Sequence, residues 1–321
     1  MSRRVASLLT ALAPLAVAAG AWLTFMHEEA VRGYAAALSP PAHAAARDTE
    51  LPPAPERGPR EAVGLDVSLA GVDAFHVFLR HPPSSGLVFD VKSGEVLWRL
   101  HPRRPLPIAS LTKIMTALLV AERTKPNERV LITQAALDYS GSGVGLLPKG
   151  RRVRLETLLN GVLIVSGNDA AIALAVHMAG SEARFVRQMN ERAAELGLAC
   201  TEFASSHGLE DGNRSCARDL AILTRLAMHR ARIRRVARTE YAELGFPIKG
   251  GKLYLSGHNP LMRLDYPGAI GLKTGYTDAA GRCFVGVARR GGRTLGVVLL
   301  NSRDPAVHAP KLLNAAFAAE R

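Results

Sequence analysis

Three strand patterns follow one another directly near the end of the chain, and they limit the fold more than any other feature. AIGLKTGYT (269–277), RCFVGVARR (282–290) and RTLGVVLLNS (293–302) are each rich in residues that favour strands. Only residues 278–281 and 291–292 connect them. Connections this short join antiparallel strands, because a parallel pair needs a crossover of roughly a dozen residues or more. The sequence therefore predicts an antiparallel meander.

Helical patterns lie between these strands and an earlier strand pair. SGLVFDV and EVLWRL flank Lys92-Ser93-Gly94, which predicts a β-hairpin that begins near residue 84. Apolar residues recur with helical spacing in several later segments. These segments are 111–122, 153–165, 169–180, 182–197, 217–231 and 305–318. Because strands stand at both ends and helices between them, the order predicts an α+β fold rather than alternating parallel strands.

The N-terminus carries a targeting pattern. Arg3 and Arg4 precede an apolar run over residues 5–25, and a basic start followed by an apolar run is the order of an export signal. The run has 21 residues, which is also enough to span a bilayer. We therefore expect residues 1–30 to be a signal peptide or an N-terminal membrane anchor. The rest of the chain is then extracytoplasmic, either secreted or anchored by this segment.

A compositional change separates this segment from the folded part. Residues 39–61 are rich in Pro, Ala and charge and show no apolar period, which is typical of a disordered or extended linker. Residues 62–80 are mixed, with weak strand character, and are consistent with either leader or first strand. The predicted organisation is a Pro/Ala-rich linker over 31–75 and one domain over 76–321.

The basic composition limits the partners. The formal net charge is +13, and arginines scattered along the chain carry most of the excess. Aromatic residues make up 5% of the chain, so a stacking platform for single-stranded nucleic acid is poorly supported. The charge is consistent with a solvated basic surface, and no nucleic-acid partner is expected. A weaker hypothesis is that it holds anionic polymers of a cell wall.

A serine and a lysine at the start of one helical pattern could form a catalytic pair. In ASLTKIMTALLVAE, Ser110 precedes Lys113 by three residues, so both lie on one face of a helix start. A serine needs an adjacent base to act as a nucleophile, and a lysine in an apolar environment has a lowered pKa and can be that base. Taken alone, the same stretch is more typical of a serine N-cap on a buried helix.

Two further motifs contain residues that suit the same chemistry. Ser166-Gly167-Asn168 stands between two helical patterns, where its hydroxyl can relay a proton and its amide can hold a substrate backbone. Lys273-Thr274-Gly275 lies on a predicted strand, where the lysine and hydroxyl can bind a carboxylate. The glycine would let a substrate backbone approach the strand closely. Each motif alone is also an ordinary turn or an ordinary exposed strand.

In this order, S-x-x-K, S-x-N and K-T-G resemble the motifs of penicillin-binding proteins and serine β-lactamases. The similarity is strongest to the serine D-Ala-D-Ala carboxypeptidases, the low-molecular-mass penicillin-binding proteins, over roughly residues 84–318. The similar segments are PIASLTKIMTALLVAE, SGNDAAIALA, MNERAAELGL, HGLEDGNRSCARDLA and GLKTGYTDAAGRCFVGVARRGG. The resemblance implies a β-lactamase/transpeptidase-like fold, in which a helical subdomain accompanies an antiparallel sheet with packed helices.

The resemblance also implies a reaction. The terminal D-Ala would leave a peptidoglycan stem pentapeptide, an acyl group would form on Ser110, and water would release it. Lys113 would be the base and Ser166 a proton relay, and β-lactams would acylate the same serine. The implied substrate-binding residues are Asn168, Lys273, Thr274, Gly275 and Tyr276, with the N–H groups of Ser110 and Tyr276 as the oxyanion hole. No metal or organic cofactor is implied.

Three different functions stay open at this point. A D,D-endopeptidase has the same three motifs. A β-lactamase-like hydrolase would need a deacylating glutamate, and Glu156 begins an E-x-x-L-N match (156–160). Because this match precedes Ser166, inside a predicted helix, Glu156 is interpreted as a helix-surface residue. A catalytically weak cell-wall-binding module would be a protein of a different functional class, and the intact motifs disfavour it.

The cysteines and two further residues, His207 and Arg303, also have expected roles. Cys200 and Cys216 flank a loop of 15 residues that contains His207, and an exported chain permits a disulfide between them. Cys283 lies on a predicted strand and is expected to be a buried free thiol. His207 is expected to bond its own loop rather than act as an acid or base. Arg303 is a candidate for binding the substrate carboxylate.

Overall fold

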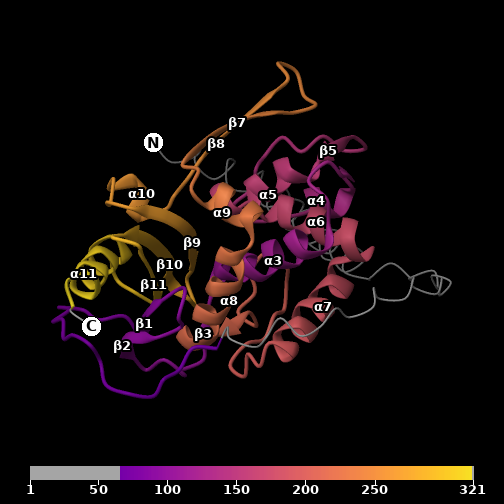
Figure 1. The fold of residues 1–321 in the computed structure, drawn as a ribbon. Helices are drawn as coiled ribbons and strands as arrows, with labels where there is room; N and C mark the ends of the chain where they lie inside the picture. Colours follow the sequence, from indigo (N-terminus) through magenta and orange to yellow (C-terminus); the bar gives the residue numbers. More distant parts are fainter. Residues whose placement is uncertain (1–65, 320–321) are drawn as a thin grey trace, which may run out of the picture. The chain divides into compact units, whose positions relative to one another are not determined.

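The computed structural model describes residues 66–319, and its central element is a five-stranded antiparallel sheet (Figure 1). The strand order is β2-β1-β11-β10-β9. The strands are β1 (Ser85–Asp90), β2 (Val96–Leu100), β9 (Ala269–Thr277), β10 (Gly281–Arg290) and β11 (Arg293–Leu300). The predicted hairpin and meander are therefore confirmed. They join through β1, which pairs along its whole length with residues 295–300 of β11.

Different helices cover the two faces of the sheet. Both faces are apolar because successive side chains of a strand point to opposite faces. On β1, Leu87 and Phe89 belong to the larger apolar core, whereas Val88 belongs to a second, smaller core. The smaller core packs against α11 (Pro305–Ala318) and the larger one against α8 (Ala217–His229). Figure 1 shows these two helices on opposite faces of the sheet. The α+β fold class is confirmed.

The remaining helices form a second part beside the sheet. They comprise η1 (Ala109–Thr112), α3 (Lys113–Arg123), α4 (Gln134–Leu137), α5 (Leu155–Ile164), α6 (Asn168–Ala179), α7 (Glu182–Glu195) and α9 (Ala231–Ala237). The α3 helix is buried along Lys113–Val120, as its apolar sequence predicts. It contacts α5, α6 and α8, so it links the sheet's helical cover to the helical subdomain.

Short elements complete the domain and shape its edges. They are β3 (Leu106–Pro107) with β6 (Arg214–Ser215), β4 (Arg129–Leu131) with β5 (Arg152–Arg154), β7 (Tyr241–Gly245) with β8 (Lys252–Ser256), and α10 (Pro260–Arg263). The β4–β5 pair and the β7–β8 hairpin both stand beside α5 in Figure 1. None of the helices within residues 66–319 is both long enough and apolar enough to cross a membrane.

The start of the domain differs from the sequence prediction. Residues 66–75, which composition placed in the linker, pack against the domain. Val67 lies in the larger core with 1% of its surface exposed, and Arg99 pairs with Asp73 at 2.6 Å. This segment forms no helix or strand beyond an isolated bridge from Ser68 to Glu95, so a periodic pattern could not reveal its contacts. The rest of the predicted linker and the targeting segment lie outside the described residues.

Candidate active site

A cleft of about 600 Å³ lies where the sheet meets the helical part. One side is formed by β9 and β10, and the other by η1 and the turn before α6. Residues of all three sequence motifs line it, namely Ser110, Ser166, Thr274 and Gly275. The other lining residues are Ser142, His258, Pro260, Tyr276, Arg282, Cys283, Phe284, Arg303, Asp304, Pro305 and Ala306.

Ser110 and Lys113 are in direct contact. The Lys113 Nζ atom lies 2.9 Å from Ser110 Oγ, and it donates to Asn168 Oδ1 and to the His207 carbonyl, each at 2.7 Å. Ser110 lies in η1, one turn before α3, and it is not the predicted N-cap. Ile108 holds that position, without a side-chain capping bond. The Ser110 hydroxyl is instead directed at Lys113 and the His207 carbonyl.

Burial favours the neutral form of the Lys113 side chain. Its side chain is completely buried, and this desolvation holds its pKa well below the usual value. The positive charge of Lys273 lowers the pKa further, whereas Asp169 and Glu210 oppose the shift. A neutral amine 2.9 Å from a hydroxyl can accept its proton.

The second motif occupies the turn between α5 and α6. Ser166 has a left-handed backbone with φ +62°, a conformation that non-glycine residues rarely adopt and that is frequent at functional sites. Asn168 begins α6, and its side chain is engaged at both ends, by Lys113 at Oδ1 and by the Ser140 carbonyl at Nδ2, 2.6 Å away. In this geometry Asn168 orients Lys113.

The third motif brings β9 against η1. A Cβ at Gly275 would lie 3.0 Å from both the Ile108 carbonyl oxygen and the Ser110 nitrogen. The glycine is therefore needed for the close approach of the strand to Ser110. Lys273 is buried and donates to the Thr274 carbonyl at 2.8 Å, and burial lowers its pKa to about 7. Tyr276 is exposed at the rim, with its hydroxyl on Asp278.

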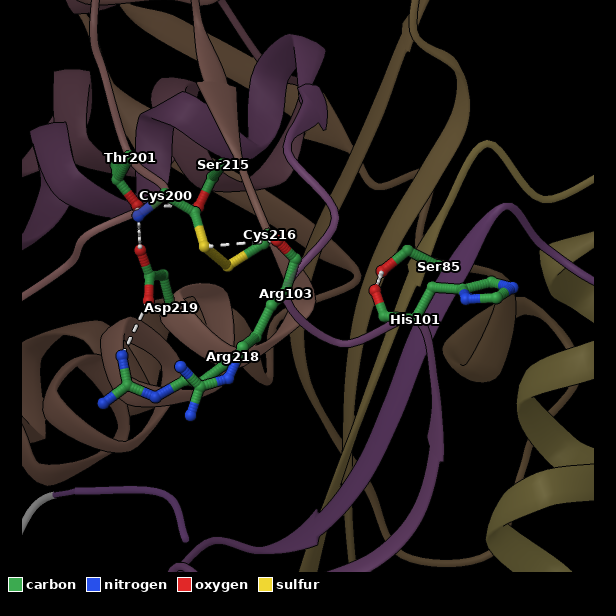
Figure 2. Close-up of a disulfide and its surroundings, with 9 residues drawn as sticks. All are labelled: Ser85, His101, Arg103, Cys200, Thr201, Ser215, Cys216, Arg218 and Asp219. Carbon is green, nitrogen blue, oxygen red and sulfur yellow. Dashed lines mark hydrogen bonds and ion pairs between the residues drawn. A yellow bond between two sulfur atoms is a disulfide. The ribbon is translucent and has the colours of Figure 1, made fainter. Parts of the chain in front are cut away.

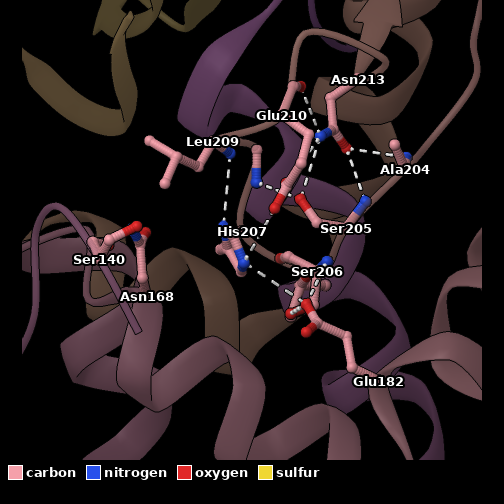
Figure 3. A network of polar contacts seen from close by, with 12 residues as sticks. Ser140, Asn168, Glu182, Ala204, Ser205, Ser206, His207, Leu209, Glu210 and Asn213 are labelled. Atoms are coloured by element: carbon pink, nitrogen blue, oxygen red, sulfur yellow. Dashed lines mark hydrogen bonds and ion pairs between the residues drawn. The ribbon is translucent and has the colours of Figure 1, made fainter. Parts of the chain in front are cut away.

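Figure 3 shows the loop after α7 that carries His207. The His207 carbonyl of this loop accepts from Lys113. The His207 ring accepts from Leu209 N–H at 3.3 Å and faces Glu182, so it bonds its own loop as expected. Desolvation lowers the pKa of His207. The neighbouring Ser206 is held by Glu182, which accepts from its backbone and side chain at 2.9 and 2.6 Å. This network fixes the position of the His207 carbonyl.

A disulfide closes the same loop (Figure 2). Cys200 and Cys216 are bonded, which confirms the predicted pairing, and Cys283 is a buried free thiol as expected. Asp219 on α8 accepts from Cys200 N–H at 2.8 Å and from the Thr201 hydroxyl at 2.9 Å. The loop that carries His207 is thus anchored at its base.

Glu156 lies away from the cleft, which disfavours a β-lactamase-like hydrolase. It is on α5, where Arg232 and Arg235 bind its two carboxylate oxygens at 3.0 and 2.6 Å. The predicted helix position is confirmed, although the side chain is only partly exposed. Arg303 does line the cleft, as does Arg282, whose guanidinium donates to the Arg303 carbonyl.

The sequence did not single out Asp169 or the Ser140 carbonyl, although both support this site. Asp169 accepts from the N–H groups of Val144 and Gly145 at 2.8 and 3.0 Å, and desolvation raises its pKa. It thereby holds the loop whose Ser140 carbonyl binds Asn168. The Gly/Ser-rich stretch around 140–145 marks a loop, but a carbonyl contact has no side-chain signature that a sequence could reveal.

The serine–lysine pair at a helix start shares its cleft with a second serine, Ser166, and with Thr274 and Gly275 of β9. This arrangement places the chain among the serine acyl enzymes with a penicillin-binding-protein fold. Within that class it belongs to the peptidase S11 family, whose model, described as D-alanyl-D-alanine carboxypeptidase, matches residues 79–304.

Individual relatives agree with this assignment. D-alanyl-D-alanine carboxypeptidase DacF of Bacillus subtilis is 34% identical over 248 residues, which are 74% of this chain and 63% of the relative. DacB2 of Mycobacterium tuberculosis is 36% identical over 222 residues, 68% of this chain and 75% of the relative. The crystal structure of a D-alanyl-D-alanine carboxypeptidase from M. tuberculosis has a TM-score of 0.72 at 33% identity and covers 76% of this chain and 94% of its own.

Proposed function

We propose that this chain is a serine D-Ala-D-Ala carboxypeptidase that removes the terminal D-Ala from peptidoglycan stem pentapeptides and binds penicillins. The observation that carries the proposal is the contact of 2.9 Å between Ser110 Oγ and a fully buried Lys113 amine at the cleft. Membership of the peptidase S11 family supports the same reaction.

Acylation follows from the geometry of the pair. Ser110 Oγ attacks the carbonyl carbon of the penultimate D-Ala while Lys113 accepts the hydroxyl proton. The peptide bond then breaks, and the nitrogen of the terminal D-Ala takes a proton and leaves. The stem peptide stays on Ser110 as an ester. The N–H groups of Ser110 and Tyr276 would stabilise the oxyanion.

Residues around the pair would hold the substrate and move protons. Lys273 and Thr274 would bind the terminal carboxylate, and Gly275 lets the substrate backbone lie against β9. Ser166 would relay the proton to the leaving nitrogen. Asn168 is bonded to Lys113 and Ser140, so we assign it first the positioning of Lys113. A contact of its amide with the substrate would require release from Ser140.

We propose an extracytoplasmic location for the domain, in keeping with its family. Residues 1–30 would export the chain or anchor it, and the segment that follows would be a spacer to the domain. Peptidoglycan muropeptides are the proposed partners, and β-lactams the proposed inhibitors.

Labelling with a fluorescent penicillin tests the proposal, combined with an assay of D-Ala release from a muropeptide pentapeptide. Wild-type protein should be labelled and release D-Ala, whereas Ser110→Ala should do neither. Ser93→Ala, at an exposed turn, is the matched control and should behave as wild type. Absence of labelling in folded wild-type protein would contradict the enzymatic function and favour a binding module.

The same assay separates a carboxypeptidase from an endopeptidase and from a β-lactamase-like hydrolase. Labelling with cleavage of cross-linked muropeptide dimers, but without D-Ala release, would identify an endopeptidase. Rapid loss of the penicillin label with turnover of the β-lactam would identify a β-lactamase-like hydrolase.

A further inference from the structure

A second cleft, distinct from the catalytic one, lies at the N-terminal end of α5. It has a volume of about 410 Å³ and shares no lining residue with the first. One wall is the β4–β5 pair, and another is the end of β7 with the turn that follows. The lining residues are Arg129, Arg152, Arg154, Glu156, Thr157, Asn160, Leu244, Gly245, Phe246 and Pro247.

Three arginines are gathered on one face of the β4–β5 pair. In both strands the middle valine is buried and the flanking residues are exposed, so Arg129, Arg152 and Arg154 all lie on the exposed face. Arg129 stands directly opposite Arg154 in the strand register. Like charges placed in this way destabilise a strand pair, so the arrangement is not explained by the stability of the hairpin.

Nearby carboxylates do not neutralise these arginines. Within residues 66–319, no ion pair joins a carboxylate to Arg129, Arg152 or Arg154. The one acidic residue in the cleft is Glu156, and both of its oxygens are already taken by Arg232 and Arg235. The cleft is therefore positive. Arg152 Nη1 donates to the Arg129 carbonyl at 3.3 Å, which leaves its other N–H groups, with the guanidinium groups of Arg129 and Arg154, to bind an anion.

We propose that this cleft binds a phosphate-bearing anionic polymer. The planar guanidinium group matches phosphate oxygens in a bidentate way. Arg152 and Arg154 are two residues apart on one strand, which spaces them by about 7 Å. A chain in which a short alcohol joins successive phosphates carries its charges at a comparable spacing. The site is concave and walled by Phe246 and Pro247, which suits an extended polymer better than a flat membrane surface.

The position of the cleft gives the binding a consequence. The α5 helix begins at the basic cleft and ends at Ile164, two residues before Ser166. Its 10 residues separate the two clefts by about 15 Å. A polymer held in the basic cleft would therefore keep the catalytic cleft near the surface that bears the polymer. This binding does not depend on the proposed catalytic function.

Fluorescence anisotropy with a labelled glycerol phosphate oligomer tests the proposal on the full chain. The double variant Arg152→Ala/Arg154→Ala should bind the oligomer about tenfold more weakly or worse, since it loses two charge-assisted contacts. The matched control Arg184→Ala/Arg187→Ala removes the same charge from exposed positions on α7 and should bind nearly as wild type. Added salt should weaken wild-type binding.

Two further probes separate the sources of phosphate. Inorganic phosphate alone should compete only weakly, because it occupies one position of a polymer site. Phosphatidylcholine vesicles containing phosphatidylglycerol should bind no better to wild type than to the double variant. The proposal would be overturned if the double variant and the α7 control bound the oligomer equally well. It would also be overturned if the vesicles, but not the oligomer, bound in a way that required Arg152 and Arg154. Penicillin labelling of Ser110 should be unchanged in both variants, so failure of catalysis and failure of polymer binding are distinguishable.

Discussion

At the scale of single residues, the site depends on how one amine is held. Among residues 66–319, no carboxylate contacts the buried Lys113 amine, and its three hydrogen bonds join it to a hydroxyl, an amide oxygen and a carbonyl. An acidic partner would keep the amine protonated and unable to accept a proton. Desolvation and the positive charge of Lys273 instead lower its pKa, which suits Lys113 to receive the Ser110 proton.

Lys113→Met should therefore remove the base while keeping an apolar side chain of similar length. We expect the rate of acylation by a fluorescent penicillin to fall by about 10²–10⁴-fold, the usual contribution of a general base. Lys149→Met, at an exposed loop position, is the control and should acylate at the wild-type rate. Circular dichroism establishes that both variants are folded. A folded Lys113→Met protein with wild-type acylation would exclude this role.

The sequence was most informative about residues whose side chains do the chemistry. The spacing of Ser110 and Lys113 predicted their contact, because residues three apart share one face of a helix turn. The partners of Lys113 were harder to infer. The His207 carbonyl has no side-chain signature, and the Asn168 oxygen reaches Lys113 only through the packing of α6 on α3. Left-handed Ser166 and Ala109 likewise follow from tertiary contacts rather than local propensity.

At the scale of elements, the predicted meander and most helices match the structure, and the region 231–263 accounts for the main omissions. The α9 helix and the β7–β8 hairpin were not predicted. The exposed face of that hairpin carries Tyr241 and Tyr254, stacked with ring centroids 6.4 Å apart. Its strands have five residues each and α9 has seven, and runs this short are ambiguous between helix and strand.

At the same scale, the disulfide constrains the loop that contacts Lys113. Cys200→Ser/Cys216→Ser should lower the free energy of unfolding by about 3 kcal/mol, the loop-closure contribution of a loop of this length. Acylation should also slow, because the loop carries the His207 carbonyl that positions Lys113. Urea unfolding and penicillin acylation measure the two effects.

Thiol titration provides the control for this prediction. Unfolded without reductant, wild-type protein should show one thiol, that of Cys283. Three titratable thiols would contradict the disulfide. Acylation at the wild-type rate in the double variant would show that the loop holds Lys113 without it.

At the scale of the whole molecule, the catalytic cleft lies at the junction of the sheet and the helical part. Gly275 on β9 meets Ser110 on η1, and Asn168 on α6 meets Lys113 on α3. The order of strands and helices predicted both parts but not their junction, because contacts between distant segments leave no periodic pattern. No single motif indicates this junction. Only the three motifs taken together predict that their segments meet at one cleft.

Packing at this junction buries Lys273, which should make stability depend on pH. Its pKa falls from the usual 10.5 to about 7 through desolvation. Because the folded-state pKa lies below the unfolded one, the unfolded chain binds more protons between these values, and stability rises with pH there. The slope of the unfolding free energy against pH is at most about 1.4 kcal/mol per pH unit. It vanishes below about pH 7, where Lys273 is protonated in both the folded and the unfolded state. The lowered pKa of Lys113 acts with the same sign.

Lys273→Met should therefore flatten this rise. Urea unfolding from about pH 7 to about pH 9 should show a free energy that increases less steeply in the variant than in wild type, by up to about 1.4 kcal/mol per pH unit. Cys283, with a pKa raised to about 11 by burial, opposes the rise equally in both proteins and cancels in the difference. Lys149→Met should follow the wild-type curve. Parallel curves for wild type and Lys273→Met would contradict the lowered pKa and mean that Lys273 stays charged in the folded protein.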